Sequence, residues 1–278
     1  ESGGAPNTRT CPVCLGLPGT LPVFNKAVLE KGLILALAFG SRISESVRFD
    51  RKHYFYPDLP RGYQITQHSV PLARGGILPI VTRKSGYKQV ALKEVHLEED
   101  AAKSVQGKSA GTTRLDFNRS GIPLVEIVTE PCLNSAEEVK GFLRQARRLV
   151  RWLSLSDGNM EEGSLRCDCN VSLDREPGTR TEIKNLNTIK GAARAVRWET
   201  ERQRQLLKRG KSGENETLMW DDILRKGRVM RSKEIDYRYL PEPNLPPVPV
   251  SGTMLDALKK RMNSHFFEVI TLWIWASH

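Results

Sequence analysis

The hydrophobic period of this chain changes at Pro131, and this change limits the folds that the chain can adopt. Before the proline, the run Leu124 to Glu130 is rich in β-branched residues, and in a strand its side chains would alternate between two faces. After it, Ser135 and Glu138 form a capping-box signature, and apolar residues recur every three or four positions. A strand followed by an amphipathic helix from Ala136 to Leu153 is therefore predicted.

The other predicted elements are also a mixture of short strands and long helices. Helices are predicted from Lys26 to Phe39 and from Thr188 to Arg209, each stopped by a glycine. Strand patterns occur in five further places: Phe49–Thr66, 76–83, 89–99, the two sides of the turn "DREPG", and the Pro-rich run from Tyr237 to Val250. Because these strands and helices do not alternate regularly, the sequence predicts the α+β class.

Composition narrows the class of protein. Among 278 residues, 43 Lys and Arg stand against 32 Asp and Glu, and this net charge of +11 favours a polyanionic partner such as nucleic acid, an anionic membrane or an anionic substrate. Five cysteines are too few for a secreted disulfide scaffold, so a reducing compartment is expected. No apolar run reaches the ~20 residues that span a bilayer, and we expect no membrane insertion.

Common catalytic motifs are missing. The patterns GxxxxGK[ST], GxGxxG, HExxH and GxSxG do not occur, and His53, His68 and His96 have no ligand spacing, so each is interpreted as structural. Cys11 and Cys14, in "CPVC", could form half of a zinc site or a redox pair. The polar N-terminus offers no strand of the thioredoxin type before them, which disfavours the redox interpretation.

Acidic and amidic residues on strand-like runs form the strongest constellation. Glu126 and Glu130 would share one strand face with Val128, opposite the apolar Val125 and Ile127. Further acids, amides and cations follow the same logic: Glu98, Glu99, Asp100 and Lys103; Glu161 and Glu162 in a turn; Arg166, Asp168 and Asn170 opposite Cys167 and Cys169; and Glu182, Lys184 and Leu186 opposite Ile183, Asn185 and Asn187.

Any one of these acids could simply form a surface salt bridge. Together, oxygen-rich clusters interleaved with Lys and Arg suit Mg²⁺ bound with phosphates, because that ion takes one or two carboxylates plus phosphate oxygens.

Six motifs, in order, resemble the GatB family, whose members belong to the aspartyl/glutamyl-tRNA amidotransferases. They are "FDRKHYFYPDLPRGYQITQ", "EEDAAKS", "LDFNRSGIPLVEIVTEP", "NMEEGSLRCDCNVSL", "EIKNLN" and "DYRYLPEPNLPP". The resemblance implies a cradle-type α+β domain with a mixed or antiparallel sheet and a few long amphipathic helices. It also implies a ligase that uses ATP and Mg²⁺ to phosphorylate the side-chain carboxylate of Glu on glutamine tRNA, or of Asp on asparagine tRNA.

Ammonia would come from a partner amidase, the GatA-type subunit, and a small GatC-type subunit would complete a heterotrimer. The resemblance assigns Glu126, Glu161 and Glu162 as Mg²⁺ ligands. The other residues that it places in the cradle are Asp50, Arg51, Lys52, Tyr54, Tyr56, Arg166, Asp168, Asn170, Lys184, Asn185 and Asn187. Cys11 and Cys14 resemble half of a four-cysteine zinc site whose other half lies upstream in the family, so a complete Zn²⁺ site is not expected here.

The ends of the chain depart from the family pattern. Residues 1–250 are expected to form the catalytic cradle without its first strand, and 251–278 to be either an extension foreign to the family or the start of a truncated helical domain. The expectation is a fragment that is insufficient alone for full activity. A mitochondrion or plastid is the expected compartment in a eukaryote, and the cytoplasm in a bacterium. A non-catalytic tRNA-binding or assembly module, driven by the basic helices, is the alternative function.

Overall fold

The computed structural model describes residues 4–107, 109, 111–173, 180–211, 215–231 and 237–263. The chain forms two compact units: the described residues of Glu1–Ile77, Leu92–Thr129 and Tyr237–His278 belong to the first, and those of Leu78–Ala91 and Glu130–Asp236 to the second. The predicted boundary near residue 250 stays a prediction. The turn "DREPG", most of the linker 210–216 and the C-terminal aromatic run lie outside the described residues, in whole or in part.

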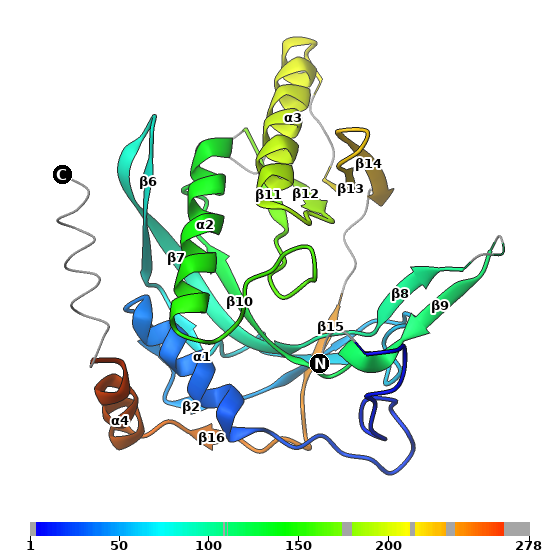
Figure 1. Cartoon of the computed structure of the whole chain (residues 1–278), viewed down its shortest axis with the longest axis vertical. Helices are drawn as coiled ribbons and strands as arrows, with labels where there is room; N and C mark the ends of the chain where they lie inside the picture. The colour runs from blue at the N-terminus through cyan, green and yellow to red at the C-terminus, as the bar shows by residue number, and fades with distance from the viewer. Residues whose placement is uncertain are drawn as a thin grey trace. The chain divides into compact units, whose positions relative to one another are not determined.

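The first unit is built mainly of antiparallel strands (Figure 1). A five-stranded sheet has the order β1-β5-β7-β10, with β6 also paired to β7, and smaller sheets are β15-β3-β4, β16-β2 and β8-β9. Its strands are β1 (Arg42–Ile43), β2 (Ser46–Val47), β3 (Asp50–His53), β4 (Tyr63–Thr66), β5 (Ala73–Arg74), β8 (Lys103–Gln106), β9 (Thr113–Asp116), β10 (Pro123–Thr129), β15 (Arg238–Pro241) and β16 (Val248–Pro249). Its helices are α1 (Lys26–Ala38), the short η1 (Phe117–Arg119) and α4 (Gly252–Asn263).

Two strands contribute to both units. The unit boundaries fall inside β6 (Ile77–Thr82) and β7 (Gly86–Glu99). The part of β7 in the first unit buries Leu92, Val95 and Leu97. Each strand was predicted from its hydrophobic pattern, and the structure confirms both.

Helix α1 packs its apolar residues into the core of the first unit. The side chain of Asn25 accepts a hydrogen bond from the backbone N–H of Ala27 and caps the helix, which ends one residue before the predicted Phe39. A Cβ atom on Gly32 would lie 2.8 Å from the side chains of both Leu72 and Leu97. Glycine at this position therefore lets the helix backbone approach β7 closely.

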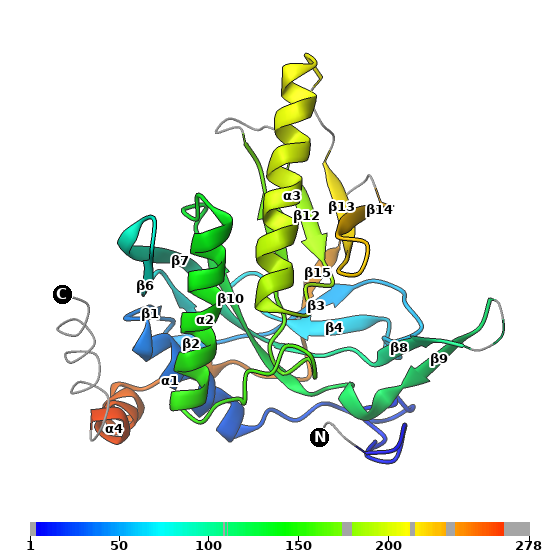
Figure 2. The same cartoon turned by 45° about the horizontal axis from the view of Figure 1, so that its top comes forward.

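The second unit packs two long helices side by side, α2 (Ala136–Trp152) and α3 (Ile189–Lys208), as both views show (Figures 1 and 2). Its sheet has the order β11-β12-β13-β14, with β12 and β13 parallel and the other pairs antiparallel. The strands are β11 (Cys169–Val171), β12 (Thr181–Lys184), β13 (Glu216–Asp221) and β14 (Lys226–Arg231). Helices and antiparallel sheets in both units confirm the predicted α+β class.

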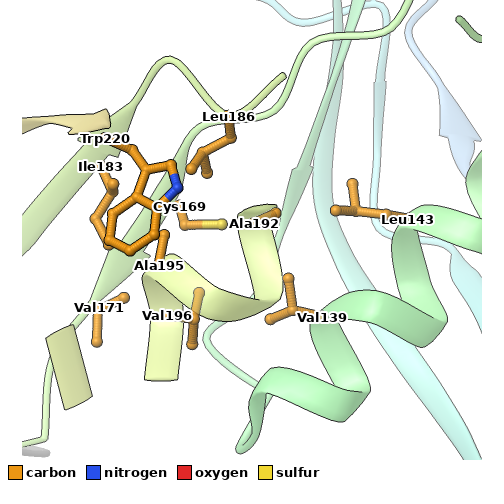
Figure 3. Close-up of a cluster of buried hydrophobic side chains, with 10 residues drawn as sticks. All are labelled: Val139, Leu143, Cys169, Val171, Ile183, Leu186, Ala192, Ala195, Val196 and Trp220. Atoms are coloured by element: carbon orange, nitrogen blue, oxygen red, sulfur yellow. The ribbon is translucent and has the colours of Figure 1, made fainter. Parts of the chain in front are cut away.

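The core of the second unit lies between these strands and helices (Figure 3). Trp220 and Ile183 are 1% and 0% exposed, and Ala192 and Ala195 of α3 belong to the same cluster. Small residues on α3 let the bulky strand side chains fill the space next to the helix backbone.

The predicted capping box at the start of α2 is confirmed in its first half. The backbone N–H of Glu138 donates to the Ser135 hydroxyl at 3.2 Å. The buried carboxylate of Glu138 accepts instead from the backbone N–H of Asn134 at 2.8 Å and binds the Lys88 ammonium at 2.6 Å. One buried acid therefore both caps the helix and ties it to β7 within this unit.

One predicted alternation is wrong. Leu186 was expected to share a face with Glu182 and Lys184, but it is buried beside Ile183. The strand ends at Lys184, and Asn185 adopts a left-handed conformation with φ 66°. This turn of the backbone shifts the phase by one residue, so Asn185 and Asn187 are exposed and Leu186 enters the core.

No described helix is long and apolar enough to cross a membrane.

Truncating the core of the second unit should destabilise the chain. Ile183→Ala is expected to lower the free energy of unfolding by about 2–5 kcal/mol, because it leaves a cavity that the neighbours fill only in part. The matched control is Met219→Ala, since Met219 is 44% exposed on the adjacent strand. Its expected effect is within about 0.5 kcal/mol. Urea denaturation followed by circular dichroism would measure both, and equal losses would contradict the assignment of the core.

Candidate functional site

Pairing between β7 and β10 places polar side chains together on one face of the large sheet in the first unit. The antiparallel register sets Glu126 opposite His96, Leu124 opposite Glu98 and Val128 opposite Glu94. Glu126 is therefore the diagonal neighbour of both Glu94 and Glu98, a separation of roughly 7–8 Å between backbones that long side chains can bridge. On the other face, Val95 and Leu97 are buried.

Glu130 does not join this group by the pairing. The β10 strand ends at Thr129, and its register with β7 shifts between Val128 and Thr129. The ladder that fixes the face of Glu126 therefore stops before Glu130. The predicted alternation holds for Glu126 and Val128 and stops there.

Glu98 is the most perturbed acid of this face. Burial and then the negative charge of Glu126 raise its pKa to about 7, while the Lys52 ammonium acts in the opposite direction. Its nearest hydrogen-bond partner is the Thr66 hydroxyl at 3.5 Å. Glu98 has no ion pair within the part of the chain that the structure describes.

Other buried acids provide a contrast. The carboxylates of Glu138, Glu199 and Glu242 each bind a Lys or Arg nitrogen at 2.6 to 2.8 Å. Such pairing removes the cost of a buried charge. Glu98 lacks it, and an acid kept half-buried beside a second acid is typical of a functional site rather than of a structural salt bridge.

Lys52 reaches this site from β3. Its ammonium lies over the ring of Tyr237 at 4.4 Å and over that of Tyr54 at 5.9 Å. Burial raises the pKa of Tyr54 well above its ordinary range, and the charge of Asp58 raises it further. Burial also raises the pKa of Tyr239, followed by the effects of Tyr237, Glu126 and Glu98. Both tyrosines are therefore protonated donors at neutral pH.

His96 is 8% exposed, and its Nε2 lies 3.3 Å from the Glu94 carboxylate. Its Nδ1 is buried with no hydrogen-bond partner among the described residues. Burial raises the pKa of Glu94, but His96 and Lys93 outweigh it and the net pKa is lowered. His96 therefore belongs to the polar face, although its lack of ligand spacing suggested a structural role.

Asp50 and Arg51, both predicted site residues, have structural partners. Asp50 is buried and accepts hydrogen bonds from the backbone N–H groups of His68 and Ser69, each at 2.8 Å. Arg51 binds both carboxylate oxygens of Glu242, at 2.8 and 3.0 Å. Burial raises the pKa of Glu242, yet the bonds from Arg51 outweigh this and lower it.

The remaining predicted residues lie in the second unit. Lys184 binds Asp168 at 2.7 Å and Glu182 at 2.8 Å. The Asn187 amide donates to the Asn185 side chain at 3.1 Å, and Asn185 in turn donates to the carbonyl of Trp220 at 2.9 Å. Glu161, Glu162, Arg166 and Asn170 are exposed there. The structure thus gathers Lys52, Tyr54 and Glu126 in one unit and Asp168, Lys184, Asn185 and Asn187 in the other.

Cys11 and Cys14 lie on one turn of the first unit with their sulfur atoms 3.1 Å apart. Structural zinc takes four ligands, and no group of three or more His, Cys, Asp or Glu residues suited to a metal occurs among the described residues. These residues therefore do not fit a complete zinc site. The two-carboxylate face fits Mg²⁺ better, since Mg²⁺ needs only one or two protein carboxylates when phosphates and water supply the rest.

Residues 1–256 match the family described as the GatB/GatE catalytic domain, which covers most of the chain. The chain belongs to this family.

Curated relatives are each named as the GatB-type subunit of an aspartyl/glutamyl-tRNA(Asn/Gln) amidotransferase. The protein from Thermus thermophilus is 49% identical over 265 residues, that from Ruminiclostridium cellulolyticum 47% over 266, and that from Leptospira biflexa 45% over 271. Each match covers 94% of this chain but only 55% or 56% of the relative. The chain therefore spans about half the length of these relatives.

The sequence did not single out Glu98, His96, Tyr237 or Tyr239 as site residues. The alternation of Glu94, His96 and Glu98 along 89–99 was a usable signal, since it continues one polar face of that strand. What the sequence alone could not supply was the register with β10. The pairing of β15 with β3, which brings Tyr239 opposite Lys52, joins residues far apart in the chain.

The titration of Glu98 tests the site. Carboxyl-carbon NMR, assigned with Glu98→Gln, should give a pKa of about 7. Glu126→Gln should lower this pKa because a like charge is removed, and Lys52→Met should raise it because a cation is lost. Since the folded pKa lies above the ordinary 4.5, the stabilising effect of this group is complete below pH 4.5 and is lost as the pH rises to about 7. Shifts of the same sign in both variants would contradict this geometry.

The Arg51 and Glu242 pair should be structural. Arg51→Met is expected to cost about 3–5 kcal/mol of stability, because it leaves a buried carboxylate unpaired. Adding Glu242→Leu should recover most of that loss. The control is Arg74→Met, because the Arg74 side chain is 48% exposed in its pair with Glu94. Its expected cost is below about 1 kcal/mol. Urea unfolding measures all three, and no recovery in the double variant would argue against a purely structural pair.

Proposed function

We propose that this chain carries the carboxylate-activating site of a tRNA-dependent amidotransferase. The reaction would convert Glu on glutamine tRNA, or Asp on asparagine tRNA, to the amide, with ATP as the source of the leaving group. The observation that supports it is the acid pair Glu98 and Glu126 beside Lys52, in a chain that belongs to the GatB/GatE catalytic domain family. The printed names of the relatives supply the substrate class.

The chemistry requires phosphorylation because a carboxylate is a poor electrophile, and a phosphate makes its oxygen a leaving group. Lys52 would bind the phosphate oxygens, and the rings of Tyr54 and Tyr237 would orient its ammonium. The hydroxyl groups of Tyr54 and Tyr239, protonated at neutral pH, would donate hydrogen bonds to developing negative charge. These groups are held in place before the substrate arrives.

Mg²⁺ fits this site because Glu98 lacks a paired cation and its pKa is raised by Glu126. Glu126 and Glu98 would supply its carboxylate oxygens. When bound, the ion would offset the charge of the phosphates. From the resemblance, Glu161 or Glu162 is proposed as a further ligand, and Arg166, Asp168, Asn170, Lys184, Asn185 and Asn187 are proposed to line the site.

The proposed assembly follows from the family. A GatA-type amidase would release ammonia from glutamine, and a small GatC-type subunit would complete the heterotrimer. The reaction would take place where translation runs, which is the cytoplasm of a bacterium or the matrix of a mitochondrion or plastid.

A second candidate function is a tRNA-binding or assembly module without catalysis. The observation that favours it is the exposed basic face of α2, on which Arg144, Arg148 and Arg151 lie at helical spacing. Surfaces of this kind bind phosphate backbones. Both functions share tRNA as the partner, so only a chemical readout distinguishes them.

Glu126→Gln distinguishes the two functions. The chain, combined with its partner subunits, would be supplied with ATP, Mg²⁺ and misacylated tRNA, and amide formation would be followed in a single turnover. Loss of the carboxylate should lower the rate by about 10²- to 10³-fold, as for removal of other preorganised electrostatic groups. Binding of the tRNA should be kept.

The matched control is Glu130→Gln, because Glu130 lies in the same motif but past the paired strand. Its rate should stay within about twofold of the unchanged chain, well inside the effect of one catalytic hydrogen bond. An unchanged rate in Glu126→Gln would support the binding module and overturn the enzyme.

A further inference from the structure

Five rings in the first unit form a continuous series, here called the aromatic row: Tyr56, Tyr54, Tyr237, Tyr239 and His68. Successive ring centroids are 5.9, 5.7 and 6.3 Å apart from Tyr56 to Tyr239, and His68 stacks on Tyr239 at 3.8 Å with an interplanar angle of 8°. These separations lie within the range of favourable aromatic pairs. The row therefore forms one wall rather than a set of scattered rings.

The two ends of the aromatic row differ. At the inner end, Tyr239 feels the charges of Glu126 and Glu98. At the outer end, Tyr56 is 54% exposed, and its sequence neighbour Phe55 is 90% exposed. The row thus leads from the acid pair to two rings that are open to solvent.

The exposed rings lie on a well-anchored loop. The backbone N–H of Tyr54 donates to the carbonyl of Gly62 at 3.2 Å, and that of Gly62 donates to Leu59 at 2.9 Å. Leu59 is buried, and the carbonyl of Asp58 accepts from Ala102 at 2.9 Å. Two adjacent exposed aromatic side chains on such a loop are typical of a binding surface.

We propose that Phe55 and Tyr56 form a stacking platform for the unpaired base at the 3′ end of an RNA, at the entrance to the Glu98 and Glu126 site. The proposal rests on the function proposed above, because the reacting carboxylate would be carried on that 3′ end. Unpaired bases stack on aromatic side chains without needing a sequence-specific pocket. Lys52, behind the platform, supplies positive charge for the adjoining phosphates.

The openness of the platform favours an RNA end over the adenine of ATP. Small-molecule sites usually bury roughly 70–90% or more of the ligand. Rings that are 54% and 90% exposed offer one face to a base and do not enclose it. A base that arrives on a polymer needs no enclosure, because the rest of the RNA contributes to its affinity.

The test uses the 278-residue chain and a short RNA hairpin with a single-stranded CCA end, in which 2-aminopurine replaces the terminal adenine. Stacking on an aromatic ring quenches the fluorescence of this base, so the probe reports contact directly. Phe55→Leu combined with Tyr56→Leu should abolish the quenching. It should also weaken binding about tenfold, as expected for the loss of roughly 1–3 kcal/mol per stacked base.

Two variants separate stacking from general damage. Tyr56→Phe keeps the ring and should retain the quenching. Tyr87→Leu is the matched control, because Tyr87 is 56% exposed but belongs to the second unit, and it should change neither quenching nor affinity. Unchanged quenching in the double Leu variant would overturn the proposal.

ATP provides the competing arm. If ATP displaced the RNA signal, and if the double Leu variant weakened ATP binding while leaving RNA affinity intact, the platform would be an adenine site for ATP and the proposal would be wrong. Amide formation separates the two claims. A chain that quenches the probe but forms no amide would defeat the proposed function and leave the stacking platform in place.

Discussion

The candidate site depends on the antiparallel pairing of β7 with β10. A strand alternates its side chains, so β7 can bury Val95 and Leu97 on one face only if Glu94, His96 and Glu98 lie on the other. The register with β10 then decides which neighbour those acids meet. A slip by one residue would turn Glu126 toward the apolar face and replace it with Val125 or Ile127. The packing of the core and the placement of the acids are therefore the same structural constraint.

Much of this arrangement could be predicted from the sequence. The periodic pattern after Pro131 gave α2 within one residue, and the three longest helices begin where the capping residues Asn25, Ser135 and Thr188 predict. The short strands and the α+β class also followed from local patterns. Glu126 was identified as a candidate because its alternation and its motif agreed.

What the sequence could not give was long-range pairing and backbone conformation. Glu98 becomes notable only when β10 is placed beside it and no cation among the described residues binds it, while Glu138 and Glu242 each have one. The left-handed Asn185 reversed the expected faces of Leu186 and its neighbours, because a positive φ at a residue other than glycine is not visible in a hydrophobic pattern. The contributions of Tyr237 and Tyr239 depend on strand pairing across most of the chain.

That last pairing has a consequence for how the protein is made. Strand β3 lies near the start of the chain, yet its partner β15 and the Arg51 to Glu242 bond come from residues about 190 positions later. On the ribosome the first unit must therefore wait, with β3 lacking one neighbour, while the whole second unit emerges. Lys52 meets Tyr237 and Tyr239 only after that. The acid pair and its cation are thus completed near the end of synthesis, and a nascent chain stopped before Tyr237 would carry Glu98 and Glu126 without the aromatic residues that hold Lys52.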